Sequence, residues 1–315
     1  MRNAGGGIKE RSGVTVGRPL LRFAGVGMPS RSGATQVIVA LRIAVLVSAL
    51  GLTGCPGRPC PTYPFRDPAG ALEHYVAMRG PARVLRAEAR VDRRDSEGRI
   101  RGTVLMFVER PERVRFDAMT QFGPAAVLTS DGERFALMDL RENRYFVGPT
   151  CPANIERLLG IRFGGEEVTR FLLGETPTID AAERTMRCEN GAYVITLVAT
   201  DGTRQELALQ VRGSDLEAQP EDQQLRLIRS EVFGPDGQTV WRVTFDNYQF
   251  VADPGDESTP QRGVMMPYSL RFEDPLRGTD TLVRFERIDL NVEVPEGAFQ
   301  QEPRPGLSVE EVTCE

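Results

Sequence analysis

Lysine and histidine are almost missing from this chain of 315 residues, since Lys9 is the only lysine and His74 the only histidine. Schiff-base formation, lysine nucleophiles and P-loop phosphate binding all need a lysine, so they are excluded from everything after residue 9. The hydrolase motifs Gly-x-Ser-x-Gly and His-Glu-x-x-His are also absent. The composition therefore argues against an enzyme, and we expect His74, which falls on a helical apolar pattern, to be structural.

Long apolar runs are scarce, and the clearest one, residues 43–55, is too short for a permanent membrane span of about 20 residues. Arg31 and Arg42 precede it and no acidic residue interrupts it, which is typical of a secretory signal peptide. Its end, Leu52-Thr53-Gly54-Cys55, resembles the lipobox of bacterial lipoproteins. That resemblance implies cleavage before Cys55 and acyl chains on it, with no other cofactor. The alternatives are an ordinary signal peptide with a chance cysteine, or an uncleaved anchor.

We therefore expect residues 1–54 to be a leader, within which residues 1–27 precede an alternative start at Met28. Removing the leader leaves 32 of the 39 basic residues and 43 of the 44 acidic ones, a net charge of −11 over 261 residues. Nucleic acids and anionic lipid headgroups both need a basic footprint, so this balance predicts that neither is a partner.

Four cysteines remain besides Cys55, and in an oxidising compartment they allow three disulfide pairings. We expect Cys60 to pair with Cys314, which would join the two ends of the mature chain, and Cys151 to pair with Cys188. A zinc site of four cysteines is the alternative, but no Cys-x-x-Cys spacing supports it, so no metal is expected.

The order of sequence patterns predicts one mainly β domain over residues 67–315. Residues 55–66 are rich in proline and read as a tether, and Asp67-Pro68 is typical of a helix start. From residue 83 the apolar residues alternate with period two, with hairpin signals at turns. Two short helical patterns, residues 152–160 and 166–174, interrupt the strands. We expect a single strongly curved antiparallel sheet, an incomplete β-barrel, whose short helices cover an apolar cavity.

Several stretches together resemble the LolA/LolB-like family of outer-membrane lipoprotein carriers and acceptors. Residues 146–163 leading into residues 168–174 are similar to the strand and two helices of LolB. Residues 120–124 are similar to its early loop, and residues 292–306 to the end of LolA-like carriers. The resemblance implies an incomplete barrel with a helical lid that holds lipoprotein acyl chains.

The resemblance and the apolar patterns together suggest three groups of site residues. The expected lid residues are Ile155, Leu158, Leu159, Phe171 and Leu172. The expected cavity walls are Phe107, Phe116, Phe135, Trp241 and Phe245. Phe122 matches the LolB residue that helps to deliver cargo into the membrane. For the first two groups the alternative is ordinary core, and for Phe122 it is a buried turn.

The expected function is that of a monomeric lipoprotein, lipid-anchored at the outer membrane, that binds acyl chains and accepts or inserts acylated lipoproteins. The periplasmic face is the expected side, and exposure on the cell surface is the alternative. Its expected partners are outer-membrane lipid, the acylated cargo and a periplasmic LolA-like carrier. Two long acidic loops, residues 213–222 and 252–263, and the extra cysteines depart from the family pattern. The alternative is therefore a structural lipoprotein of the same fold whose acidic loops bind another envelope protein.

Overall fold

The computed structural model describes residues 57–96, 98–254 and 262–314, so the expected leader and Cys55 lie outside the described residues. Residues 57 to 315 form one compact unit. The whole described core and both disulfides lie inside it, so this unit has what it needs to fold by itself.

Within the described residues fourteen strands form one sheet, with the order β14-β6-β5-β4-β3-β2-β1-β13-β12-β11-β10-β9-β8-β7. The strands are β1 (Val84–Asp95), β2 (Gly98–Glu109), β3 (Arg113–Thr120), β4 (Gly123–Ser130), β5 (Arg134–Asp139), β6 (Arg144–Pro149), β7 (Glu183–Glu189), β8 (Ala192–Val198), β9 (Arg204–Val211), β10 (Leu225–Phe233), β11 (Thr239–Ala252), β12 (Gly263–Asp274), β13 (Thr279–Leu290) and β14 (Ser308–Glu311). All neighbours are antiparallel except β14, which pairs with β6 in parallel.

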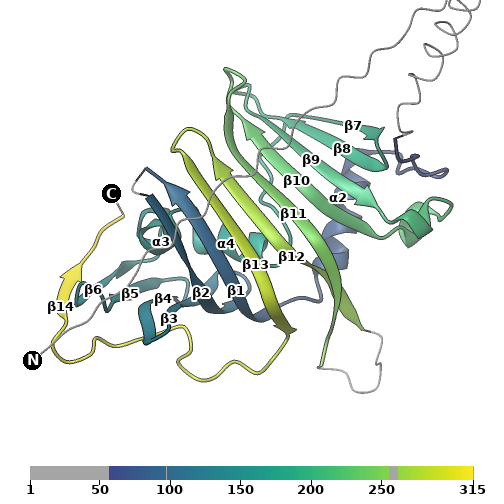
Figure 1. Cartoon of the computed structure of the whole chain (residues 1–315). Helices are drawn as coiled ribbons and strands as arrows, with labels where there is room; N and C mark the ends of the chain where they lie inside the picture. Colours follow the sequence, from purple (N-terminus) through teal and green to yellow (C-terminus); the bar gives the residue numbers. More distant parts are fainter. Residues whose placement is uncertain (1–56, 97, 255–261, 315) are drawn as a thin grey trace, which may run out of the picture. The chain divides into compact units, whose positions relative to one another are not determined.

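The sheet consists of two meanders, β1–β6 and β7–β13, which meet where β1 pairs with β13. The sheet curves strongly (Figure 1). It stays open, because β7 and β14, the two ends of the strand order, do not pair with each other. The expected incomplete barrel is thus confirmed. The β1–β13 register shifts so that Glu286 is the extra residue between Phe285 and Arg287, which forms a β-bulge.

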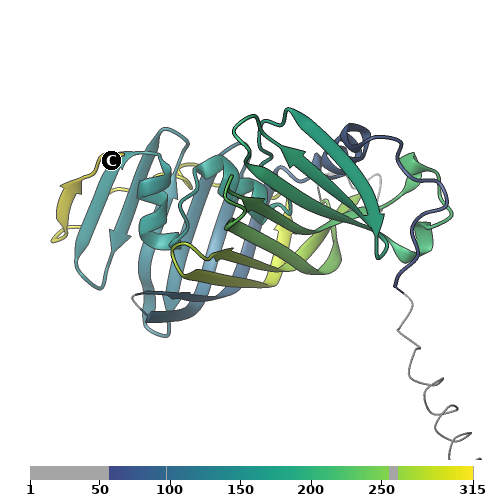
Figure 2. The ribbon, with the colours of Figure 1, turned by 90° about the horizontal axis from the view of Figure 1, so that it is seen from above.

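Three helices lie on the concave face of the sheet: α2 (Pro68–Arg79), α3 (Pro152–Leu159) and α4 (Gly165–Leu172) (Figure 2). Asp67 caps α2 by accepting a hydrogen bond from the Gly70 amide at 2.9 Å, as its sequence predicts. The loop between β9 and β10 adds two short 3₁₀ turns, η1 (Gly213–Asp215) and η2 (Pro220–Asp222).

The main core fills the space between the helices and the concave face, where Phe116, Leu128 and Phe135 are at most 2 % exposed. A second, smaller cluster lies on the outer face of β4–β6, around Met138 and Tyr145. The segment after β13 packs on it, and the Tyr145 hydroxyl donates to the Gln301 carbonyl at 2.7 Å. The outer face of the first meander is therefore partly covered by the C-terminal segment.

The disulfides join Cys60 to Cys188 and Cys151 to Cys314, so the predicted pairing is wrong although all four cysteines are used. The reason is the open sheet. Cys60 lies beside β7 at one edge, whereas Cys314 follows β14 at the opposite edge. The two ends of the chain therefore cannot meet, and each disulfide ties one end to the sheet edge nearest to it.

The proline-rich segment before α2 also lies against the domain. Pro61 is buried, the Thr62 amide donates to the Leu216 carbonyl at 2.8 Å, and Phe65 packs edge-on against Tyr193. Together with the Cys60 disulfide these contacts hold residues 60–66 against the domain. Residues 57–59 also lie beside the Asn190-Gly191 turn, so the described part of the predicted tether packs on the domain.

The disulfide connectivity gives a first prediction. Each bond closes a loop of more than a hundred residues (sequence separations 128 and 163), so the double change Cys60→Ser and Cys188→Ser should lower the free energy of unfolding by about 2–4 kcal/mol. Urea titration measures this loss. Peptide mapping without reductant tests the pairing, and a Cys60–Cys314 peptide would contradict the structure.

Candidate functional site

The helical insert between β6 and β7 is the candidate site. We call residues 152–172 the flap: they comprise α3, the loop at residues 160–164 and α4. The insert crosses the concave face of the first meander, with α3 beside β4 and β5 and α4 beside β2 and β3 (Figure 2). Gly160 ends α3 in the left-handed conformation (φ 67°), which allows the chain to turn sharply into the loop.

A disulfide fixes the first end of the flap. Cys151 is the residue that caps α3, and its bond to Cys314 ties this point to the C-terminal segment. Asn154, which is fully buried, adds a hydrogen bond from its Nδ2 to the Pro149 carbonyl at 2.9 Å. The start of the flap is therefore held covalently and by a buried hydrogen bond.

A buried polar cluster fixes the other end, at residues 173–175. Arg79 of α2 is 3 % exposed, and its Nε donates to the carbonyl of Leu173, the residue that caps α4. Its Nη1 donates to the Met265 carbonyl. A buried guanidinium is thus placed at the negative end of a helix, where the helix dipole stabilises it.

Tyr75 and Glu175 complete this polar cluster. The Tyr75 hydroxyl donates to the Gly174 carbonyl, and burial raises the pKa of Tyr75, so the hydroxyl keeps its proton. Glu175 is 3 % exposed and forms an ion pair with Arg110 at 2.5 Å. Three side chains from α2 and the β2–β3 turn therefore hold the chain at the point where the flap ends.

The five predicted lid residues all face the core beneath the flap. Ile155 is fully buried, Phe171 and Leu172 are 6 and 7 % exposed, and Leu158 and Leu159 are half-buried. They pack against the main core. Their position on the underside of the flap agrees with the prediction, while a role in lipid binding remains a prediction.

An aromatic cluster joins the flap to the second meander. Phe163 of the flap loop lies edge-on to Phe171, Trp241 and Phe272, with ring centroids 5.0, 5.7 and 5.3 Å away. Sequence reasoning missed Phe163 and Phe272. Phe272 lies two residues after Leu270 on the same face of β12, so strand alternation was the signal that could have found it.

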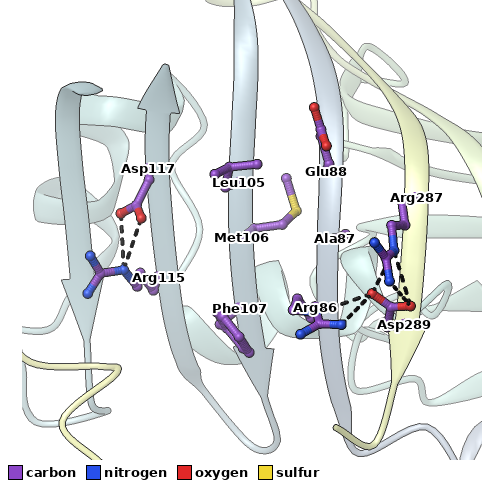
Figure 3. A pocket seen from close by; sticks show the side chains of 10 residues that line it. All are labelled: Arg86, Ala87, Glu88, Leu105, Met106, Phe107, Arg115, Asp117, Arg287 and Asp289. Atoms are coloured by element: carbon purple, nitrogen blue, oxygen red, sulfur yellow. Dashed lines mark hydrogen bonds and ion pairs between the residues drawn. The ribbon is translucent and has the colours of Figure 1, made fainter. Parts of the chain in front are cut away.

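Four of the five predicted wall residues, Phe116, Phe135, Trp241 and Phe245, face the concave core, but Phe107 does not. Its neighbours Met106 and Val108 are buried on the concave side, so Phe107 points to the outer face and lines a hollow of about 250 Å³ with Leu105 (Figure 3). The prediction for Phe107 is wrong because both faces of β2 are apolar here, and alternation alone does not tell which face is covered.

Three hollows are described, and all open on the outer face. One surrounds Phe107, a second of about 260 Å³ lies beside residues 299–303, and a third of about 880 Å³ lies near the hairpin ends of β1–β2 and β12–β13. The concave face under the flap is occupied by the protein's own side chains. A ligand that binds there would therefore have to displace part of the flap.

Phe122 lies in the turn between β3 and β4 and is 91 % exposed, so the alternative of a buried turn residue is wrong. Its amide donates to the Thr120 hydroxyl at 3.2 Å, which fixes the turn that presents the ring. Its predicted contact with a membrane remains a prediction.

His74 makes contacts of a structural kind. Its Nε2 lies 2.8 Å from the Gln223 carbonyl oxygen, and its ring packs against Phe65. Across the described part of the chain, no three His, Cys, Asp or Glu side chains are placed to hold a metal ion. The described helices also include none with the length and apolar character needed to cross a membrane.

No protein-family model and no curated protein sequence matches this chain. Among solved structures it is similar to a DUF1329 family protein from Desulfovibrio piger, with 13 % identity, TM-score 0.47, and coverage of 74 % of this chain and 96 % of that one. A LolA superfamily protein from Nitrosomonas europaea has 12 % identity, TM-score 0.47, and coverage of 75 and 99 %. A putative outer membrane lipoprotein-sorting protein domain from Vibrio parahaemolyticus has 10 % identity, TM-score 0.40, and coverage of 72 and 95 %. Similarity at these identities and TM-scores does not indicate what this chain binds.

The buried end of the flap gives a second prediction. Glu175→Gln removes the partner of Arg110 and should lower the free energy of unfolding by about 2–3 kcal/mol, below the usual loss for a fully buried pair because Arg110 is partly exposed. Urea titration measures the loss. Hydrogen exchange should become faster in residues 165–172 before it does in β8.

Glu166→Gln is the matched control, because it removes an exposed ion pair with Arg170 inside α4. It should change the free energy of unfolding by about 0.5 kcal/mol or less. Equal losses in the two variants would show that the polar cluster does not anchor the flap.

Proposed function

We propose that this protein is a lipid-anchored envelope lipoprotein that holds an acyl chain between the flap and the concave face of its sheet. The observation that carries the proposal is the way in which α4 is attached. Among the described residues its only side-chain ion pair, Arg170 with Glu166, lies within the helix, and Val168, Phe171 and Leu172 make apolar contacts with the core. Such a contact can exchange for an acyl chain, because one apolar surface replaces another.

The energetics support this exchange. Covering an acyl chain is worth about 0.8 kcal/mol for each CH₂ group removed from water. Lifting α4 without a ligand would expose Phe171 and Leu172 to water, at a similar free-energy cost for each carbon. The helix is therefore expected to stay in place until a ligand binds. The fixed end at Glu175 and the bonds of α3 to Arg93 and Arg277 confine the movement to α4 and the loop before it. The flap would thus open only as far as an acyl chain fills the space.

The cargo that fits this proposal is the acyl portion of a lipoprotein, received from a periplasmic carrier of the LolA kind and passed to the outer membrane. In this proposal Cys55 carries the lipid anchor, the protein is a monomer on the periplasmic face of the outer membrane, and Phe122 contacts the bilayer. The resemblance of the sequence to LolA/LolB-like proteins supports this assignment, and so does the exposure of Phe122.

A second function is favoured by one observation, the large core of buried side chains on the concave face. A protein whose interior is already packed can be a structural lipoprotein of the envelope. Its acidic loop at residues 213–222, which projects from the second meander between β9 and β10, would then bind another envelope protein.

The only tryptophan of the chain can distinguish the two functions. Trp241 is half-buried in the aromatic cluster beneath the flap, so an acyl chain that enters there must approach its ring. We expect a fatty acid brominated in the middle of its chain to quench Trp241 fluorescence in a saturable way. Quenching by bromine requires near contact, so a dependence on bromine position would give the depth of the chain.

The matched control is the double variant Trp241→Phe and Phe299→Trp, which carries its one tryptophan in the segment that covers the outer face. It should not be quenched by the same fatty acid. Equal quenching of both proteins would indicate binding unrelated to the flap. No quenching of the wild type by any positional isomer would reject acyl binding and leave the structural function.

A further inference from the structure

The outer face of the sheet carries an ordered array of charged pairs. Arg86 lies opposite Asp289 and bonds it at 2.9 Å, and Arg242 pairs with Glu231. Hydrogen bonds from Arg242 and Thr239 outweigh the effect of burial and lower the pKa of Glu231. Over most of this face each arginine thus has a carboxylate beside it, which is the arrangement that stabilises a sheet.

One region departs from this arrangement. The largest of the three hollows, about 880 Å³, lies on the outer face of β1, β2, β12 and β13 close to their hairpin ends. We call it the arginine hollow. Its charged lining consists of six arginines and two aspartates: Arg90, Arg94, Arg99, Arg101, Arg271, Arg284, Asp92 and Asp280. The arginine hollow is therefore a positively charged region on the surface of a protein whose mature chain is strongly acidic.

The register of the strands places like charges directly opposite each other in this region. Arg94 of β1 faces Arg99 of β2, and Arg90 of β1 faces Arg284 of β13. Like charges directly across a strand pair destabilise a sheet. Elsewhere on the same face this chain uses carboxylates at such positions, as at Asp289 opposite Arg86. Asp280 of β13 also lies opposite Arg94, but its carboxylate bonds Arg271. The two Arg–Arg pairs therefore need a reason other than stability.

The carboxylates of the hollow do not neutralise it. Asp92 bonds both Arg99 and Arg101, and the Arg99 hydrogen bond helps to hold the pKa of Asp92 at about 2, so this one charge is shared by two arginines. Asp280 pairs with Arg271 at 2.7 Å.

Outside the lining, Glu286 pairs with Arg90 at 2.6 Å, and Glu273 lies 3.9 Å from Arg271 but is shared with Arg242. The exposed side chains of Arg94 and Arg284 form no ion pair with any described residue.

Apolar side chains project beside the hollow. The register joins the ends of β1–β2, β3–β4 and β12–β13 at one side of the sheet, since Arg94 pairs with Asp280 and Thr103 with Met119 (Figure 1). Phe122 and Leu276 lie at these ends and are 91 and 63 % exposed, whereas Ile100 alternates with Arg99 and Arg101 and points to the concave face. Gln121, the neighbour of Phe122, lines the hollow itself.

We propose that the arginine hollow binds the phosphate of anionic lipid headgroups and docks these hairpin ends onto an anionic bilayer. Guanidinium groups bind phosphate oxygens in pairs, and apolar side chains beside them can enter the acyl boundary. Soluble phosphate would not account for the two large apolar side chains, Phe122 and Leu276, exposed at the hairpin ends. The negative net charge of the chain led to the prediction that anionic headgroups are not a partner. That charge is a sum over all residues and does not describe the local charge of this face. The docking surface lies on the opposite face of the sheet from the flap, so it does not depend on what the flap binds.

Flotation with vesicles tests the proposal, using the unit from Gly57 onward, which lacks the lipidated cysteine. We expect it to bind vesicles of equal parts phosphatidylcholine and phosphatidylglycerol, more weakly as salt is raised, and to leave pure phosphatidylcholine vesicles largely unbound. Arg94→Gln and Arg284→Gln together should weaken binding about fivefold for each arginine. Because each change removes a like-charge pair, the melting temperature should stay the same or rise.

The matched control is Arg184→Gln with Arg212→Gln, two exposed arginines on the second meander that also remove two positive charges. Equal weakening in both double variants would reduce the effect to net charge and overturn the proposal. A fall in melting temperature for the Arg94 and Arg284 variant would show a structural role and would also overturn it. Binding of soluble glycerol phosphate as strong as binding to vesicles would assign the hollow to a free phosphate compound, and a dimer formed through this face would assign it to a second copy.

Discussion

An open, curved β-sheet leaves an apolar concave face that must be covered, and this requirement governs the rest of the molecule. A closed barrel would fill its interior with its own strands, but here β7 and β14 remain separate edges. Three short helices supply the missing cover, and the main core forms between them and the sheet. Eight-residue helices such as α3 and α4 are too short to be stable by themselves, so their structure depends on this packing.

Short helices that depend on packing need to be held at their ends, and the chain does this in two different ways. The start of the flap is tied by a disulfide to the C-terminal segment, and its end by the buried cluster around Arg79 and Glu175. A buried guanidinium tolerates this position because the carbonyls at the end of α4 and the Met265 carbonyl accept its hydrogen bonds. Within the flap, α3 is also bonded to the sheet, since Arg93 donates to the Leu158 carbonyl at 3.0 Å and Arg277 pairs with Glu156. The contacts of the α4 side chains with the core are mainly apolar, which places the least specific interactions beneath α4.

The two faces of the sheet follow different physical rules. On the concave face burial determines which residues occur, and the core side chains there are almost fully excluded from water. On the outer face the pairing of charges determines which side chains lie opposite each other, and with no lysine after residue 9 every cation in this array is an arginine. Planar guanidinium groups can pair with two oxygens at once, which suits both the regular ion pairs and the arginine hollow.

Local patterns in the sequence were sufficient for the strands, the helices and several details of the chain path. The Asp67 cap, the left-handed Asn190-Gly191 turn (φ 51 and 73°) and the Glu286 bulge all depend on neighbouring residues, so they can be predicted without the fold. The apolar undersides of α3 and α4 were predictable for the same reason, since helical spacing alone places Ile155 and Phe171 on one face each.

Only the tertiary structure decided features that join distant residues. The cysteine pairing depends on which sheet edge each end of the chain reaches, and sequence separation contains no such information. The outward direction of Phe107 depends on which face of β2 the helices cover. The Arg79 site and the arginine hollow depend on strand register across β1, β2, β12 and β13 and on contacts between residues more than ninety positions apart. Local residue patterns thus specify the elements and their periodicity, whereas the pairing of the strands specifies which side chains meet.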